Sequence, residues 1–217
     1  MILLALPPAI VAGELVRLQT RQPVVALTFD GGANADGARG VLAVLRREQV
    51  PGTFFLTGQF VKTYPALARA IGRRYPVCNH TVNHLDLTRL STAAVRREII
   101  VAERMIRTAT TRDPRPCFRF PYGARDARTL RAVSGLGYTS VRWTVDTWGW
   151  MGRSSQSVPG VVRRVVDGLV PGQIVMMHLG SARDRSRIDT KALPGVIRAV
   201  RARGYRFVTL AGIRAPR

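Results

Sequence analysis

The chain has 217 residues, of which 46% are hydrophobic and 22% are charged. This composition is typical of one globular domain with a sizeable core, and it excludes a disordered or low-complexity chain. The charge is unbalanced, because 34 Lys and Arg residues against 13 Asp and Glu residues give a net charge of +21. We expect such a surface to attract an anionic cell-wall polymer, although arginine usage in a GC-rich genome explains the charge equally well.

The arginines are spread along the chain and are not interleaved with aromatic residues in one basic arm. We therefore predict no specific binding of nucleic acid.

The N-terminal segment, residues 1–13, reads MILLALPPAIVAG. It is too short for a transmembrane helix, which needs about 20 apolar residues. The segment is either the remnant of a secretory signal or a packed arm, and we favour the remnant. We accordingly expect a secreted or cell-envelope protein whose single domain covers residues 14–217.

From residue 24 onward, short apolar runs alternate with amphipathic segments. The runs, each predicted to form a strand, are VVALTFD (24–30), GTFFLTG (52–58), PVCNHT (76–81), CFRFPYG (117–123), YTSVRWTVD (138–146), QIVMMH (173–178) and YRFVTL (205–210). Predicted helices lie at about 36–49, 64–74, 91–109, 126–135, 157–168 and 191–203. This alternation predicts βαβ units with a parallel sheet, either a barrel or a doubly wound sheet.

Polar side chains distinguish between these two folds. Asp30, His80, Arg119, Asp146 and His178 each lie at or near the C-terminal end of a different predicted strand. In a barrel these ends meet at one mouth, where active sites are built, whereas the outer strands of an open sheet lie too far apart. We therefore predict a distorted (β/α) barrel of seven parallel strands, with the active site at the C-terminal strand ends.

The histidines indicate a metal site. His80 and His84 are four residues apart in HTVNH, and His178 is the third histidine of the chain. Neutral imidazoles at this spacing can bind one divalent ion. Three tryptophans surround Asp146 in the stretch RWTVDTWGW, which indicates either a core cluster or a wall on which a sugar ring stacks.

Read in order, these segments resemble the polysaccharide deacetylase family, also called the NodB-homology domain or carbohydrate esterase family 4. The matching motifs are TFDGG (28–32), HTVNH (80–84), RFPY (119–122), DTWGW (146–150) and VMMH (175–178). The resemblance runs from about Glu14 to Leu210 and includes the closing ALPGVIRAVRARGYRFVTL.

The resemblance implies a metal-dependent hydrolase that removes N-acetyl groups from N-acetylglucosamine-type glycans, peptidoglycan or chitin-like. It implies that His80 and His84 hold the metal, zinc with cobalt or manganese as alternatives. It also implies that Asp30 is the general base, that His178 is the general acid and that Arg119 orients Asp30. This division of labour suits an amide, because the leaving amine needs a proton.

Five further residues complete the predicted site. Asp146 is expected to act with the catalytic groups, and an N–H near Tyr122 is expected to stabilise the oxyanion. The residues expected to bind the substrate are Pro121, Tyr122, Trp148 and Trp150.

The chain departs from the family's pattern at three positions. Gly31 replaces an Asp that is the third metal ligand, and we expect position 31 to face the metal. Gly149 replaces an acid that tethers the arginine, and Cys78 replaces a glycine. The identity of the third protein ligand is therefore open. Two other functions also remain possible for the chain: a catalytically silent glycan-binding protein with the same fold, or an esterase acting on acetyl esters of xylan.

Cys78 and Cys117 each lie two residues before a predicted site residue, on strands expected to be neighbours. Parallel neighbours are about 4.8 Å apart, but their side chains point in the same direction. We therefore predict two free, buried thiols.

Overall fold

The computed structural model describes residues 14–32 and 34–210, so the predicted N-terminal segment lies outside the described residues. The strands are β1 (Glu14–Leu15), β2 (Val24–Gly31), β3 (Thr53–Leu56), β4 (Val77–Asn79), β5 (Cys117–Phe118), β6 (Thr139–Val141), β7 (Val145–Asp146), β8 (Gln173–His178) and β9 (Arg206–Val208). The α-helices are α1 (Ala38–Arg47), α2 (Gly58–Thr63), α3 (Pro65–Arg74), α4 (Thr92–Thr110), α5 (Ala127–Ser134), α6 (Val158–Asp167) and α7 (Ile188–Arg201).

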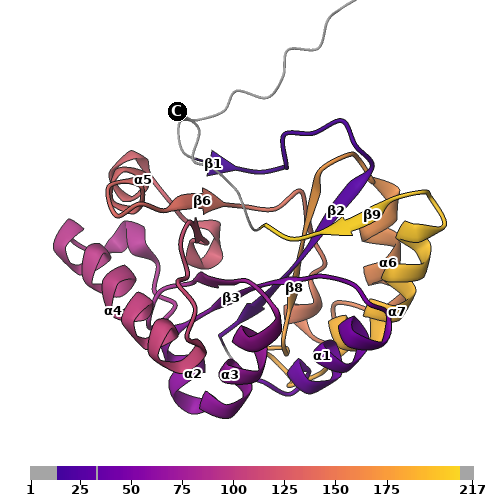
Figure 1. Ribbon diagram of the computed structural model, residues 1–217, viewed down its shortest axis with the longest axis horizontal. Helices are drawn as coiled ribbons and strands as arrows, with labels where there is room; N and C mark the ends of the chain where they lie inside the picture. Colours follow the sequence, from indigo (N-terminus) through magenta and orange to yellow (C-terminus); the bar gives the residue numbers. More distant parts are fainter. Residues whose placement is uncertain (1–13, 33, 211–217) are drawn as a thin grey trace, which may run out of the picture.

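All pairings in the described sheet are parallel, and the helices lie around its outer side (Figure 1). The strand order is β1-β6-β5-β4-β3-β2-β8-β7, and β9 also pairs with β2. β7 stands at one end of this path and β6 stands next to β1 at the other end, and both are parts of the run 139–146, so this run brings the two ends together. The sheet is therefore curled into a distorted barrel, as predicted.

The described chain has nine strand segments where the sequence predicts seven strands. The difference has two sources. The run 138–146 is divided into β6 and β7, which pair with β5 and β8 respectively, and β1 adds a short strand beside β6. Helix α2 is also absent from the prediction, because it begins within the apolar run 52–58.

Strand β2 shows how the barrel divides the side chains. All eight of its residues are buried. Leu27 and Phe29 pack in the outer core, against the helices, whereas Ala26 belongs to a core cluster inside the barrel. Since side chains alternate along a strand, Thr28 and Asp30 share the inner face with Ala26. The sequence of β2 thus places one carboxylate at the mouth of the barrel.

Side chains cap the starts of two helices. Ser91 accepts a hydrogen bond from the N–H of Ala94 at the start of α4, and Asp126 accepts one from Thr129 at the start of α5. These side chains satisfy N–H groups that lack partners within the helix. No helix in the described ranges is long and apolar enough to span a bilayer.

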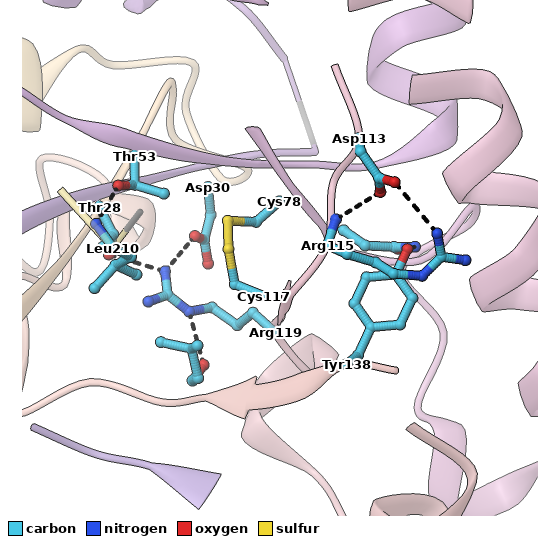
Figure 2. The surroundings of a disulfide bond; sticks show 12 residues. Thr28, Asp30, Thr53, Cys78, Asp113, Arg115, Cys117, Arg119, Tyr138 and Leu210 are labelled. Atoms are coloured by element: carbon cyan, nitrogen blue, oxygen red, sulfur yellow. Dashed lines mark hydrogen bonds and ion pairs between the residues drawn. A yellow bond between two sulfur atoms is a disulfide. The ribbon is translucent and has the colours of Figure 1, made fainter. Parts of the chain in front are cut away.

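The prediction of two free thiols is wrong, because Cys78 and Cys117 form a disulfide (Figure 2). Strands β4 and β5 pair with Asn79 opposite Phe118, so the two cysteines are also opposite each other. Their Cα atoms are 5.1 Å apart, within the range of disulfides. The prediction treated the sheet as flat. In a tightly curved barrel, inward-facing side chains of neighbouring strands converge, which brings the two sulfur atoms together.

Candidate active site

Asp30 and Arg119 form an ion pair inside the barrel mouth. Arg119 is 1% exposed, and its Nη1 donates to Asp30 Oδ1 at 2.6 Å and to Thr28 Oγ1 at 3.0 Å. Its other nitrogens donate to the backbone carbonyls of Val141 and Arg142. The guanidinium group is thus fixed by four acceptors, and it holds the Asp30 carboxylate in one orientation.

The charge of Asp30 is stabilised by this environment. Burial by itself would raise the pKa of Asp30, but the positive charge of Arg119 and the neighbouring histidines outweigh burial, so the pKa lies below its ordinary value. Asp30 is therefore ionised at neutral pH. Its second oxygen, Oδ2, lies 3.7 Å from Nε2 of His80 and faces the cavity at the barrel mouth.

The two histidines of HTVNH lie side by side, with ring centroids 4.8 Å apart. His80 Nδ1 lies 2.8 Å from the carbonyl oxygen of Arg119, an arrangement in which Nδ1 carries the proton and donates it, leaving Nε2 with a free lone pair. Burial lowers the pKa of His80, and burial together with the neighbouring His80 lowers the pKa of His84 to about 4. Both imidazoles are therefore neutral at neutral pH, as metal binding requires.

Residues that the sequence analysis missed hold this histidine turn. Glu98 on α4 accepts hydrogen bonds from the N–H groups of Val82 and Asn83, and also from the Asn83 side chain. Asn79 accepts from the N–H of Thr81. A glutamate in the middle of an amphipathic helix gives no sequence signal for this role, because its partners lie 15 and 16 residues earlier.

A cavity of ≈ 470 Å³ opens at the C-terminal ends of the strands. It brings together most of the predicted site residues. The residues that line it are Asp30, Gly32, Asn34, His80, Asn83, His84, Phe120, Tyr122, Trp143, Asp146, Trp150, Met176, His178, Gly180 and Ala182. Phe120 was not among the predicted site residues. The aromatic walls and the convergent polar groups are typical of a site for a polar ligand with apolar faces.

Trp148 and Pro121 do not line this cavity. Trp148 is turned away to stack against Arg164, with the guanidinium carbon 3.4 Å from the ring centroid. Its backbone has φ 60°, and its N–H donates to Asp146 Oδ1. Pro121 is buried beneath the turn that exposes Tyr122, a side chain that is 73% exposed at the rim of the cavity.

Asp146 organises the turn that follows it. Its Oδ2 accepts a hydrogen bond from the indole N–H of Trp150 at 3.2 Å, and its backbone carbonyl accepts one from Arg164. The Trp150 ring in turn lies beside His178, with centroids 6.5 Å apart. Asp146 therefore positions a wall of the cavity, and its charge also acts on Arg119 and His178.

Position 31 does not face the histidines, contrary to our expectation. Gly31 is the last residue of β2 and lies on the outer face of that strand. A Cβ atom at this position would lie 2.9 Å from Leu56 and 3.1 Å from Leu179, both apolar. A Cβ atom on Gly32, in contrast, would meet only Thr57 at 3.5 Å and His84 at 3.9 Å. Position 32 is thus the one from which a side chain approaches a histidine.

The donor atoms fit a divalent ion held by two imidazoles. The bond from His80 Nδ1 to a carbonyl is typical of metal-binding histidines, because it fixes the ring and leaves Nε2 free. Within the described ranges, however, no three His, Cys, Asp or Glu side chains are grouped so as to hold a metal.

Comparison with known proteins decides the family. The sequence profile of polysaccharide deacetylases matches residues 17–141, more than half of the chain. The chain belongs to the polysaccharide deacetylase family. Three of the five strand-end residues from which the barrel was predicted, Asp30, His80 and Arg119, lie within the matched range.

Relatives of this polysaccharide deacetylase include a chitooligosaccharide deacetylase from Bradyrhizobium sp. (strain ANU 289), 35% identical over 191 residues, which cover 83% of this chain and 86% of that protein. A peptidoglycan-N-acetylglucosamine deacetylase from Listeria monocytogenes is 30% identical over 94% of this chain and 41% of its own length. These named relatives are hydrolases of carbon–nitrogen bonds other than peptide bonds, the enzyme class that the sequence predicts.

Solved structures of the family have the same fold. The Bc1960 peptidoglycan N-acetylglucosamine deacetylase matches with a TM-score of 0.86 and 25% identity, covering 95% of this chain and 96% of that one. A pseudoenzyme of carbohydrate esterase family 4 from Bacillus anthracis matches with a TM-score of 0.81 and 26% identity, covering 94% of this chain and 68% of that one. A mutant of that pseudoenzyme has restored enzymatic activity.

Proposed function

We propose that this polysaccharide deacetylase is a metal-dependent hydrolase that removes N-acetyl groups from N-acetylglucosamine-type glycans, either peptidoglycan or a chitin-like oligosaccharide. The observation that carries the proposal is the ionised Asp30 carboxylate. It is fixed by Arg119, it faces His80, and it lines the same cavity as His178. A base and an acid thus border one space in which an acetamido group can lie.

The reaction assigned to these residues is amide hydrolysis. Asp30 Oδ2 accepts a proton from a water molecule as the water oxygen bonds to the acetyl carbon. His178 in its protonated form donates a proton to the nitrogen as the carbon–nitrogen bond breaks, which leaves acetic acid and a free amine on the sugar. Asp30 then releases its proton to solvent and His178 takes one up, which restores both groups. Arg119 keeps Asp30 ionised beforehand, so that the base is ready at neutral pH.

His80 and His84 would hold the divalent ion, with zinc expected and cobalt or manganese as alternatives. When bound, such an ion makes an amide carbonyl more electrophilic and lowers the pKa of water, both of which a stable amide requires. Catalytic zinc sites commonly use about three protein ligands. The third donor in this proposal is Asp30 itself or a nearby oxygen of Asn34, Asp36 or Asn83.

The cavity walls support a sugar as substrate. Trp143, Trp150, Phe120 and Tyr122 present aromatic surface around the polar groups. Aromatic faces stack well against the apolar faces of sugar rings, while the polar groups orient the acetamido group. The names of the relatives, a chitooligosaccharide deacetylase and a peptidoglycan-N-acetylglucosamine deacetylase, favour these two classes of glycan.

We further propose that the protein acts outside the cytoplasm. The Cys78–Cys117 disulfide supports this location, since disulfides persist mainly in oxidising compartments. A surface with a net charge of +21 would hold the enzyme near an anionic cell-wall polymer.

A catalytically silent glycan-binding protein is the second candidate. Two observations favour it: within the described ranges no three-residue metal cluster is found, and a pseudoenzyme of the same fold is among the similar structures. The fixed, ionised Asp30 favours the active enzyme, because binding a sugar does not require a buried ion pair at this place.

Acetate release separates the two candidates. The purified protein is incubated with chitin oligosaccharides, peptidoglycan fragments and acetylated xylan, each with added Zn²⁺, Co²⁺ or Mn²⁺, and its bound metal is measured. We expect acetate from the N-acetylated glycans in the presence of metal. Binding of glycan without acetate release would support the silent protein, and release from xylan alone would support the esterase.

Single histidine variants test the metal site. We expect His80→Ala and His84→Ala each to abolish bound metal and acetate release while the circular dichroism spectrum is unchanged. Leu85→Ala is the matched control, because Leu85 follows His84 in the chain and its side chain is 44% exposed. Either histidine variant retaining wild-type activity after treatment with a chelator would show that the metal assignment is wrong.

A further inference from the structure

The first turn of α7 places a second carboxyl group behind His178. Asp189 is 3% exposed, and its Oδ2 accepts a hydrogen bond of 2.7 Å from the backbone N–H of His178. Its Oδ1 is buried and has no hydrogen-bond partner. Buried carboxyl oxygens normally have partners, so this one requires an explanation.

The carboxyl group of Asp189 fills the space of a missing side chain. A Cβ atom built on Gly149 would overlap the carboxyl carbon and both carboxyl oxygens of Asp189. Position 149 is where the motif DTWGW departs from the family's pattern by lacking an acid. The chain therefore has a carboxyl group at this place, but the group comes from α7.

The ring of His178 depends on its backbone for its position. Its Nδ1 is buried without a hydrogen-bond partner, and its ring lies beside that of Trp150. The neighbouring N–H of Leu179 is bonded to the carbonyl of Asp30, and the N–H of His178 is bonded to the side chain of Asp189. Asp189 is thus the side chain that fixes the backbone where β8 ends.

Burial also changes the titration of Asp189. Burial raises the pKa of Asp189 to about 7, the N–H of His178 and the hydroxyl group of Thr147 lower it, and the charge of Asp146 raises it. Burial thus favours the protonated carboxyl group, in which Oδ2 still accepts from the N–H of His178.

We propose that Asp189 is a positioning residue for His178: it occupies the volume of a side chain at position 149 and fixes the end of β8 through the backbone N–H of His178. The assignment of His178 as general acid rests on the proposed function. The hydrogen bond and the shared volume do not depend on it.

Two readouts test the proposal. In Asp189→Ala the N–H of His178 loses its acceptor, so we expect its hydrogen exchange, followed by NMR, to become about tenfold faster or more. We expect kcat to fall about 10- to 100-fold with KM changed less than about twofold, because small misplacements of a reacting group reduce the rate to this extent. Asp189→Asn retains an acceptor oxygen, so exchange stays slow and kcat stays within about threefold of wild type.

Thr190→Ala is the matched control. Thr190 is the next residue of α7 and bonds to the carbonyl of Gly37, away from His178. The Thr190→Ala variant should therefore leave both the exchange rate of the His178 N–H and kcat unchanged. Equal losses in Thr190→Ala and Asp189→Ala would assign the effect to the helix and overturn the proposal, as would an Asp189→Ala variant with wild-type exchange and kcat.

Position 149 tests the shared volume. Gly149→Ala should displace the Asp189 carboxyl group and reproduce the faster exchange of the His178 N–H and the lower kcat. If Asp189→Ala does not fold, Gly149→Ala is the variant that tests the proposal. Combining Gly149→Asp with Asp189→Ala should restore part of the lost kcat. Gly149→Ala with wild-type exchange and kcat would overturn the proposal. If the wild-type protein released no acetate, the proposed function would fail, while the exchange rate of His178 would still decide the role of Asp189.

Discussion

The ion pair between Arg119 and Asp30 predicts a coupled loss of stability and activity. In Arg119→Met the apolar stem remains, but the guanidinium group and its bonds to Asp30, Thr28 and two carbonyls are lost. Asp30 is only 5% exposed, so its charge would remain buried without a counterion. Removing one partner of a buried pair costs about 3–5 kcal/mol.

This cost corresponds to a decrease in Tm of about 6–20 °C, because a chain of this length loses about 2–4 °C per kcal/mol. The free energy of unfolding is measured by urea denaturation and Tm by calorimetry. Arg119→Lys is the matched control. It retains a positive charge but not the fork of donors, so its losses should lie between those of the wild type and Arg119→Met.

The pH dependence gives a second measure. In the wild type the folded-state pKa of Asp30 is lowered, so the pair stabilises the fold above the unfolded-state pKa, and this stability is lost as the pH falls through the folded-state pKa. Without Arg119, burial raises the pKa of Asp30. The difference in Tm between wild type and Arg119→Met should therefore be largest near neutral pH and shrink on acidification.

The same shift moves the acidic limb of kcat/KM to higher pH, because the base must be ionised. A Tm for Arg119→Met within about 2 °C of wild type at neutral pH, or an unmoved acidic limb in an active variant, would refute this account of Asp30.

Two other regions give sharp predictions. The disulfide joins residues 39 apart in sequence. The double variant Cys78→Ala/Cys117→Ala should therefore have a free energy of unfolding, measured with urea, that is lower by about 4 kcal/mol. Two free thiols in the denatured, unreduced wild type would contradict the bond. For the metal site, calorimetric titration with Zn²⁺ should show tighter binding in Gly32→Asp and not in Gly31→Asp, which should instead lose stability. Tighter binding in Gly31→Asp would show that position 31 faces the metal after all.

Much of the fold could be predicted because its signals are local. Buried strands read as apolar runs, and the alternation of runs with amphipathic segments is visible over short windows. The convergence of Asp30, His80, Asp146 and His178 on one cavity also followed, since each stands at a strand end and parallel strand ends share one edge.

The parts that could not be predicted depend on curvature or on distant contacts. The disulfide requires the tilt between two neighbouring strands, which a pattern of residues does not contain. Trp148 was expected in the site because it is close to Asp146 in sequence, yet a backbone with positive φ turns it toward Arg164. Asp189 lies in an amphipathic helix, where one buried acid gives no signal until its partner is known.

The two glycines at acid positions of the motifs illustrate why a motif alone does not decide activity. Both Gly31 and Gly149 read as lost carboxylates. In the structure, however, the carboxyl group of Asp189 occupies the volume that a side chain at Gly149 would fill. Gly31 ends a strand on its outer face, where apolar side chains leave no room for a charge. At position 149 a carboxyl group is thus supplied by another residue, whereas at position 31 the structure has no room for one. The two glycines look alike in the sequence, whereas the atoms that fill the space of each missing side chain distinguish them.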